Sequence, residues 1–191
     1  MAAAKQYINK KHLLTYTMEE QLVHGMDVSN LAYELAKELA VPEDIRYQMA
    51  VAGMVHDIGK IRLMHTVEEM DNPMMVEEMK IVRMHSQISC EILKKAGYPD
   101  FILESVLYHH ENYDGSGYPE NRIGEQIPLG ARILRVCDVY SALTSDRPYR
   151  RAFEKDAAME LMIDEVKNFD MKVFLAFQRM IHTKEHRKVH L

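Results

Sequence analysis

The segment AVAGMVHDIGK, residues 50–60, closes an apolar helical stretch with an adjacent histidine and aspartate. His56 and Asp57 are expected to be buried there, and a buried carboxylate needs a compensating charge. A divalent metal would supply that charge, because imidazole nitrogen and carboxylate oxygen are ligands that borderline cations accept. The alternative is an ion pair between Asp57 and Lys60 beside a core histidine. This segment alone does not separate the two interpretations.

Histidine or aspartate also interrupts apolar helical patterns elsewhere in the chain. Each such residue on its own is typical of a satisfied buried polar group. Several predicted helices that each carry one on an apolar face instead favour a shared metal centre. The residues concerned are His24, with Glu20 one turn before it, and then His56, Asp57, His85, His109, His110 and Asp138.

Apolar residues recur at helical spacing through most of the sequence, and no convincing alternation of period two is present. The fold class is therefore predicted to be all-α, a single-domain bundle of about seven helices around a central metal site. Residues 58–76 and the loop at residues 114–128 fall outside the predicted helices. Those helices span Met18–Ala40, Pro42–Asp57, Glu77–Ala96, Phe101–His110, Leu129–Thr144, Lys155–Lys167 and Met171–His182.

The length of 191 residues suffices to bury one core, and no repeat, low-complexity tract or glycine–serine linker divides it. A single domain is expected over residues 1–191. Within it, residues 1–16 form an N-terminal segment and residues 183–191 a tail that is expected to fray.

Charge and composition limit the partners and the compartment. The formal net charge of −5 argues against binding to nucleic acid polymers or to an anionic membrane. No apolar run approaches the roughly 18 to 20 residues that span a bilayer, and the first residues lack a secretory signal pattern. Cys90 and Cys137 lie in helical patterns and suit buried thiols rather than a disulfide. A cytoplasmic protein is the expectation.

A second motif is more specific than the His–Asp pair. The string HHENYDGSGYP, residues 109–119, follows HDIGK and His85 and precedes DVYSALTSDRPYR, residues 138–150. Together these segments resemble the HD-GYP branch of the HD superfamily of metal-dependent phosphohydrolases. That branch is known for hydrolysing the bacterial second messenger cyclic di-GMP. The resemblance runs from about Met18 to His182, nearly the whole chain.

The resemblance implies a set of metal ligands. Two divalent ions are expected, iron or manganese first and zinc as an alternative, and Glu20 matches a carboxylate that holds a third ion in some members. Asp57 would bridge the two ions as a catalytic residue. One ion would be completed by His24, His56 and Asp138, and the other by His85, His109 and His110.

The resemblance also implies substrate contacts. Lys60 would contact the substrate phosphate during catalysis, and Arg147 and Arg150 match positions that grip phosphate or guanine. The loop is expected to shape the rim of the site rather than to bind metal, because its glycines permit positive φ and its proline fixes the exit. The rim residues are Asp114, Gly115, Gly117, Tyr118 and Pro119.

The sequence departs from the family pattern in ways that bear on the substrate. Ser141 stands where an aspartate is common, Ser86 and Ser89 where proline and glycine are common, and residues 62–64 where a Gly-Ile-Pro element is usual. The expected activity is hydrolysis of cyclic di-GMP to linear pGpG and onward to GMP. The alternatives are a phosphohydrolase for another cyclic dinucleotide, or a module that binds nucleotide or protein without turnover. No receiver or sensor domain is recognised, so a regulatory or signalling protein partner is a further expectation.

Overall fold

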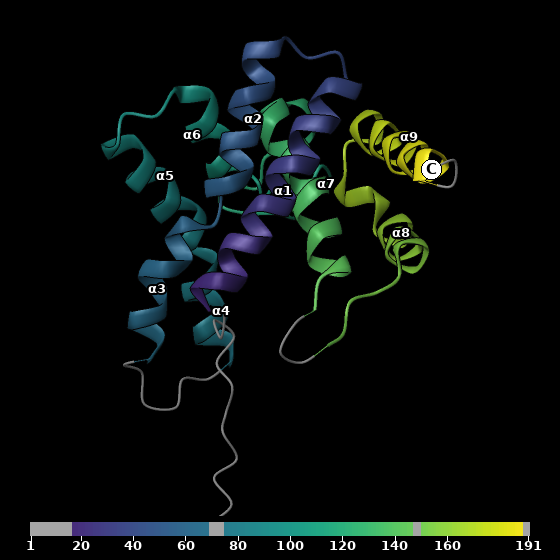
Figure 1. Ribbon diagram of the computed structural model, residues 1–191. Helices are drawn as coiled ribbons and strands as arrows, with labels where there is room; N and C mark the ends of the chain where they lie inside the picture. The colour runs from purple at the N-terminus through teal and green to yellow at the C-terminus, as the bar shows by residue number, and fades with distance from the viewer. Residues whose placement is uncertain (1–16, 69–74, 147–149, 189–191) are drawn as a thin grey trace, which may run out of the picture.

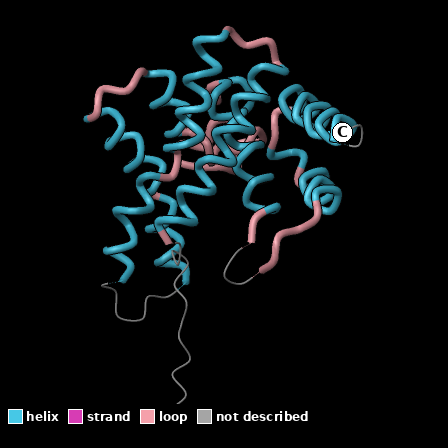
Figure 2. The backbone as a smooth tube through the Cα atoms, viewed as in Figure 1, coloured by secondary structure: helices cyan, strands magenta, loops and turns pink. Residues whose placement is uncertain are grey.

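The computed structural model describes residues 17–68, 75–146 and 150–188. These residues form nine α-helices and two short 3-10 helices and contain no strand longer than a single bridge residue, so the all-α prediction is confirmed (Figures 1 and 2). None of the described helices is both long and apolar enough to cross a membrane. The α-helices are α1 (Met18–Glu38), α2 (Glu43–Val55), α3 (Ile58–Glu68), α4 (Met75–Arg83), α5 (His85–Lys95), α6 (Asp100–Leu107), α7 (Leu129–Thr144), α8 (Lys155–Asp164) and α9 (Met171–Lys188).

Short sequence signals set where the helices begin. The Thr17 side chain accepts a hydrogen bond from the Glu20 backbone at 3.1 Å, and the Glu20 carboxylate accepts one from the Thr17 backbone at 2.7 Å. This reciprocal capping box starts α1. Pro42, Pro99 and Pro128 directly precede α2, α6 and α7, where a fixed φ and a missing N–H are tolerated.

Two helical groups flank a central pair of helices. In Figure 1, α1 and α2 lie side by side, with α7 behind α1, α8 and α9 on one side, and α3, α5 and α6 on the other. The main core lies among α1, α7 and α9 and includes the fully buried side chains of Leu35, Leu134 and Phe177. The α7 helix contacts α1 and α6 as well as α8 and α9.

One prediction about the helices was wrong. Residues 58–76 were expected outside the helices, but Ile58–Glu68 forms α3. Gly59 and the polar residues after it obscure the helical spacing, and tertiary packing decides the conformation. In the structure Leu63 is buried against Ile81, Val82 and Ile88.

The predicted helix over residues 77–96 is divided at Met84 into α4 and α5, so His85 opens a helix instead of lying in the middle of one. The last helix, α9, continues to Lys188, beyond the predicted end at His182. The part of the expected frayed tail that the structure describes is therefore helical, and residues 189–191 lie outside the described range.

Candidate metal centre

Most of the candidate ligands lie where one helix ends and the next begins. His56 and Asp57 form the two-residue joint between α2 and α3. His85 is the first residue of α5, and His109 and His110 directly follow Tyr108, the C-cap residue of α6. Because the chain turns at each joint, these side chains can point to a common centre.

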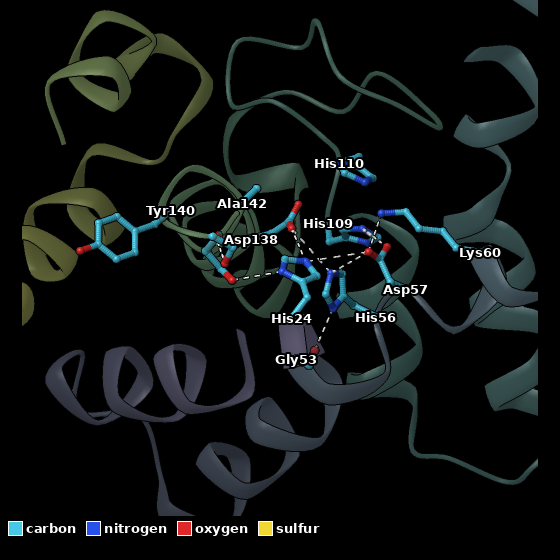
Figure 3. Close-up of polar contacts among 12 residues, drawn as sticks. His24, Gly53, His56, Asp57, Lys60, His109, His110, Asp138, Tyr140 and Ala142 are labelled. Atoms are coloured by element: carbon cyan, nitrogen blue, oxygen red, sulfur yellow. Dashed lines mark hydrogen bonds and ion pairs between the residues drawn. The ribbon is translucent and has the colours of Figure 1, made fainter. Parts of the chain in front are cut away.

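His24 and Asp138 reach the same centre from the middle of helices. His24 lies on α1 and Asp138 on α7, and the packing of these two helices brings the side chains together. The His24 Nε2 atom is 3.0 Å from Asp138 Oδ1. Figure 3 shows both side chains directed toward His56, Asp57 and His109.

The structure gathers the predicted ligands other than Glu20 into two groups that correspond to the two sets named from the sequence, with the expected bridging residue Asp57 in the first. Within each group, one potential ligand atom per residue lies within 4.8 Å of the others. All of these residues are buried or nearly so. The first group is Asp57, His85, His109 and His110, and the second is His24, His56 and Asp138.

The Asp57 carboxylate faces both groups, one oxygen to each. Its Oδ1 atom is 3.2 Å from His85 Nε2 and 3.9 Å from His109 Nε2. Its Oδ2 atom is 3.4 Å from His56 Nε2 and 3.9 Å from His24 Nε2. This division of one carboxylate is the geometry that a ligand shared by two cations requires.

Backbone carbonyl groups orient three of the imidazole rings. In each case the carbonyl lies three residues earlier, in the last turn of the preceding helix, where carbonyls lack helical donors. A carbonyl can only accept, so Nδ1 carries the proton and Nε2 presents a lone pair to the centre. The pairs are His56 Nδ1 with Gly53 O at 2.8 Å, His85 Nδ1 with Val82 O at 2.6 Å, and His109 Nδ1 with Val106 O at 2.6 Å.

Several atoms that face the centre lack hydrogen-bond donors. With Nδ1 protonated on both rings, the Nε2 lone pairs of His85 and His109 face each other at 3.3 Å, and His110 Nε2 lies 3.1 Å from His85 Nε2. Among the described residues, His56 Nε2 and Asp57 Oδ1 are buried without any hydrogen-bond partner. Each unsatisfied buried polar atom costs about 1–3 kcal/mol. Divalent cations would satisfy all of these atoms, so the residues fit a metal centre.

The electrostatics of the first group favour metal-binding protonation states. Burial and the neighbouring imidazoles lower the pKa of His109 to about 3, and burial and His109 hold the pKa of His110 well below its usual range. Burial opposes charge on Asp57, but His56 and Lys60 hold the pKa of its carboxyl well below the ordinary value. Neutral imidazoles and an ionised carboxylate are the forms that coordinate cations.

The second group holds a proton more readily. Burial lowers the pKa of His56, but Asp57 and Asp138 outweigh it and raise that pKa overall. Burial likewise opposes charge on Asp138, while its hydrogen bond with His24 and the nearby His56 imidazole keep its pKa well below the ordinary value. A bound cation would take the place of the proton that these two carboxylates favour on His56.

The ion pair that formed the alternative interpretation is also present. Lys60 Nζ lies 2.5 Å from Asp57 Oδ2. A single ammonium group nevertheless leaves the facing lone pairs of His85 and His109 unsatisfied on the other side of Asp57. Lys60 therefore belongs to the centre without explaining it.

The loop after the paired histidines folds back on His110. The Tyr118 backbone donates to His110 O at 3.1 Å, and the two rings stack with centroids 4.8 Å apart. A Cβ atom on Gly117 would lie 2.2 Å from the Asn112 nitrogen, so only glycine permits this approach. Further out, Asp114 accepts hydrogen bonds from the Ser116 backbone at 2.9 Å and its hydroxyl at 2.6 Å.

Comparison with known proteins identifies the family of this chain. The sequence profile of the HD domain matches residues 4–173. The chain belongs to the HD domain family. A cyclic di-GMP phosphodiesterase of Pseudomonas aeruginosa is 35% identical over 85% of this chain, and the cyclic di-GMP phosphodiesterase response regulator RpfG of Xanthomonas campestris is 38% identical over 69%. A 3′3′-cGAMP-specific phosphodiesterase of Vibrio cholerae is 36% identical over 79%.

This HD domain corresponds to part of longer proteins. It spans 40%, 35% and 36% of the length of those three relatives, respectively. Among solved structures, an HDG"Y"P protein from Bdellovibrio bacteriovorus superposes with a TM-score of 0.68 at 18% identity, covering 87% of this chain and 55% of the other. The HD domain of a Listeria monocytogenes phosphodiesterase in complex with cyclic di-AMP gives 0.58 at 19% identity, covering 90% and 92%. The predicted HD-GYP resemblance is confirmed.

Two of the predicted site residues make other contacts in this HD domain. Glu20 is exposed, belongs to neither ligand group, and caps α1. The Arg150 guanidinium donates to Ala142 O at 2.8 Å and Leu143 O at 3.1 Å, and to the carbonyl of Arg151 at 2.7 Å. Arg150 thus closes the end of α7, where helical carbonyls lack backbone donors, instead of projecting a free guanidinium.

The other predicted contacts are placed as follows. Arg147 lies outside the described residues. Lys60 lies at the centre, and the rim loop stands over His110 through Tyr118. Gly115 has a φ of +85°, in the left-handed region that favours glycine. The Tyr118–Pro119 peptide bond is cis.

Two contacts of the HD domain were not assigned from the sequence. Ser141 Oγ is 3.1 Å from His24 Nδ1, so the residue noted only as a departure touches a candidate ligand. Arg135, one turn before Asp138, donates through Nε to Asn112 Oδ1 at 3.0 Å. The i−3 and i+3 spacing from Asp138 on one helix is the signal that could have identified both.

Proposed function

We propose that this HD domain is a metal-dependent phosphodiesterase that hydrolyses cyclic di-GMP to linear pGpG and onward to GMP. The observation that carries the proposal is the division of the Asp57 carboxylate between two groups of buried ligands. The names of the relatives from Pseudomonas aeruginosa and Xanthomonas campestris support the choice of substrate.

The chemistry of the site suits this reaction. Two divalent cations, when bound, would neutralise a phosphodiester and supply an activated water near neutral pH. Iron or manganese is proposed first and zinc as the alternative, because imidazole and carboxylate ligands suit all three. Glu20 would have to leave its capping position to hold a third ion.

The chain's own residues would bind and orient the substrate. Lys60 Nζ, held beside Asp57, is placed to donate to a non-bridging phosphoryl oxygen and to stabilise its growing charge. Arg135 lies partly buried on the same helix as Asp138; apart from its Nε contact with Asn112, its guanidinium makes no hydrogen bond within the described part of the chain. Its remaining N–H groups are available to an anionic ligand.

A second candidate substrate has specific support. A relative that is 36% identical is named as specific for 3′3′-cGAMP. Ser86, Ser89 and Ser141 depart from the pattern of the cyclic di-GMP branch and are buried. Hydrolysis of a related cyclic dinucleotide is therefore the alternative. The cytoplasmic location, the single-domain organisation and a regulatory protein partner remain predictions from the sequence.

The test is elemental analysis of anaerobically purified protein combined with a hydrolysis panel. Cyclic di-GMP, 3′3′-cGAMP and cyclic di-AMP are incubated separately with metal-loaded protein, and the products are separated by chromatography. We expect about two metal ions per chain and fastest loss of cyclic di-GMP. Fastest loss of 3′3′-cGAMP would select the alternative substrate. Binding of nucleotide with no hydrolysis in any metal-loaded sample would select the non-catalytic module.

A further inference from the structure

Among the ligand histidines that have a partner on Nδ1, His24 differs from the other three. His56, His85 and His109 have backbone carbonyl partners, which can only accept. His24 Nδ1 instead faces the hydroxyl of the buried Ser141 at 3.1 Å. A hydroxyl can accept a hydrogen bond or donate one.

This difference leaves the tautomer of His24 open. If Ser141 accepts, Nδ1 carries the proton and Nε2 offers a lone pair to a metal. If Ser141 donates, the proton lies on Nε2 and is donated to Asp138 Oδ1 at 3.0 Å. The second arrangement satisfies His24, Ser141 and Asp138 without any metal, so it competes with metal binding.

A cavity open to solvent distinguishes the second ligand group from the first. Side-chain burial does not, because each group contains one half-buried residue. A cavity of about 430 Å³, lined in part by Val23, His24 and Ser145, borders the second group. A cation held there would therefore have a path to solvent.

We propose that Ser141 is a positioning residue for His24 that makes the metal site of His24, His56 and Asp138 the weaker and more readily exchanged of the two. The proposal rests on the two-metal centre of the proposed function. It adds an order of loading. The site of His85, His109 and His110 binds its metal ion first, and the site of His24, His56 and Asp138 binds second.

The experiment is a titration of metal-free protein with Mn²⁺ at pH 8, followed by calorimetry and by electron paramagnetic resonance of free Mn²⁺. For the native chain we expect two separable binding steps. Ser141→Asp supplies an acceptor that cannot donate to the ring and should tighten the second step by roughly 10-fold or more. Ser141→Ala removes the competing donor without adding an acceptor and should tighten that step by roughly two- to threefold, while the first step changes less than about twofold in either variant.

The control is Ser145→Ala. Ser145 is one turn further along α7, and its hydroxyl donates to Ser141 O at 2.8 Å without a recorded contact to His24. Both binding steps should be retained in this variant. Thermal unfolding of each metal-free variant establishes that it is folded, and Ser141→Ala alone suffices for the comparison if Ser141→Asp does not fold.

A second measurement reads the tautomer directly. Nitrogen-15 spectra of metal-free protein labelled at histidine should place the His24 proton on Nε2 in the native chain and on Nδ1 in Ser141→Asp, with His24→Gln identifying the signal. If Ser141→Asp acted only by adding negative charge, the His24 proton would stay on Nε2 in that variant.

The outcomes separate the two proposals. Two Mn²⁺ steps that respond equally to the Ser141 variants, or do not respond, would overturn the positioning role and leave the two-metal centre intact. A native His24 already protonated only at Nδ1 without metal would also overturn it. Absence of Mn²⁺ binding to the folded native protein would overturn the metal centre itself.

Discussion

At the scale of single residues, one histidine can serve two parts of the structure at once. His56, His85 and His109 each use Nδ1 to satisfy a carbonyl at the end of a helix and leave Nε2 for the centre. The free carbonyls of helix ends thereby become the groups that fix ring orientation and tautomer. A ligand at a helix end is oriented without any additional polar side chain.

Replacing Asp57 tests the shared ligand. Asp57→Ala removes the only carboxylate that faces both groups among the described residues, so both metal steps and hydrolysis should be lost, with turnover reduced by more than about 100-fold. Metal content and cyclic di-GMP hydrolysis are measured together. Asp156→Ala, exposed at the start of α8 and outside both ligand groups, is the matched control and should retain both. Normal turnover in Asp57→Ala would rule out the bridged centre.

The pH dependence of the metal-free protein follows from the buried histidines. Burial lowers the pKa of His109 to about 3, and the pKa of His110 is also lowered, so the unfolded chain binds their protons more readily than the folded chain does. The free energy of unfolding should therefore fall as the pH decreases from about 6.5 toward 3. His56, whose pKa is raised, opposes this trend but is one group against two.

Urea unfolding of metal-free protein between pH 7.5 and 4.5 measures this trend. Replacement of His109 by glutamine should flatten the dependence, because one buried group that resists protonation is gone. A free energy of unfolding that rises steadily with acid over this range would contradict the assignment of neutral, buried imidazoles to His109 and His110.

Residue spacing identified the metal ligands better than the substrate contacts. A histidine or aspartate inside an apolar pattern is conspicuous in a sequence because burial of a polar group demands a reason. The role of Arg150 could not be predicted in the same way. An arginine that caps a helix and one that binds phosphate can occupy the same position in a sequence pattern, and only the structure shows the contacts with the end of α7. Ser141 lies one turn from Asp138, which spacing shows, but its contact with His24 depends on the packing of α1 against α7, which spacing along the chain does not reveal.

At the scale of helices, the fold was predictable where a helix buries one face in the main core. The bounds of α7 were predicted as observed because Pro128 and an apolar stripe define them. The α3 helix was missed because it is held by contacts with α4 and α5. Gly59 permits the close packing of α3 on α5, since a Cβ there would lie 2.3 Å from His85 O. That contact, which fixes His85 beside Asp57, depends on tertiary structure.

The Arg150 contacts predict a structural effect on α7. Arg150→Ala removes the side-chain donors to Ala142 O and Leu143 O and should lower the free energy of unfolding by about 1–3 kcal/mol. Thermal unfolding should then shift down by roughly 2–10 °C. Arg151→Ala, whose exposed side chain makes none of these bonds, is the control. If Arg150 served the substrate alone, KM would rise with no change in Tm.

Gly117 predicts an effect of the loop on the centre. A Cβ atom there would meet backbone atoms of three residues, at 2.2 to 2.5 Å, including His110 O. Gly117→Ala should therefore displace the loop, break the stacking of Tyr118 on His110 and lower kcat/KM at least about 10-fold, since small misplacements are costly in catalysis. Gly97→Ala meets no atom within 4 Å and controls for the strain of a backbone substitution. Equal activities of the two variants would show that the loop position is immaterial.

At the scale of the whole molecule, the centre joins two sets of helices. His24, His56 and Asp138 come from α1, the end of α2, and α7, whereas His85, His109 and His110 come from α5 and the end of α6. Asp57 stands at the joint between α2 and α3 and touches both sets. This interface contains facing lone pairs and unsatisfied atoms, so cations bound there would strengthen the contact between the two sets.

Metal binding should therefore stabilise the whole fold. Mn²⁺ at 100 times its dissociation constant stabilises a single-site protein by about 2.7 kcal/mol, which corresponds to a rise in Tm of roughly 5–10 °C for a chain of this length. Scanning calorimetry with and without Mn²⁺, and after addition of a chelator, measures the rise and its reversal. His85→Gln should lose most of it, because His85 belongs to the group that is proposed to load first, whereas Ser141→Ala should retain it. A Tm that is independent of Mn²⁺ in folded protein would mean that the imidazoles and carboxylates do not converge on cations, because ions bound only to the native state must raise it.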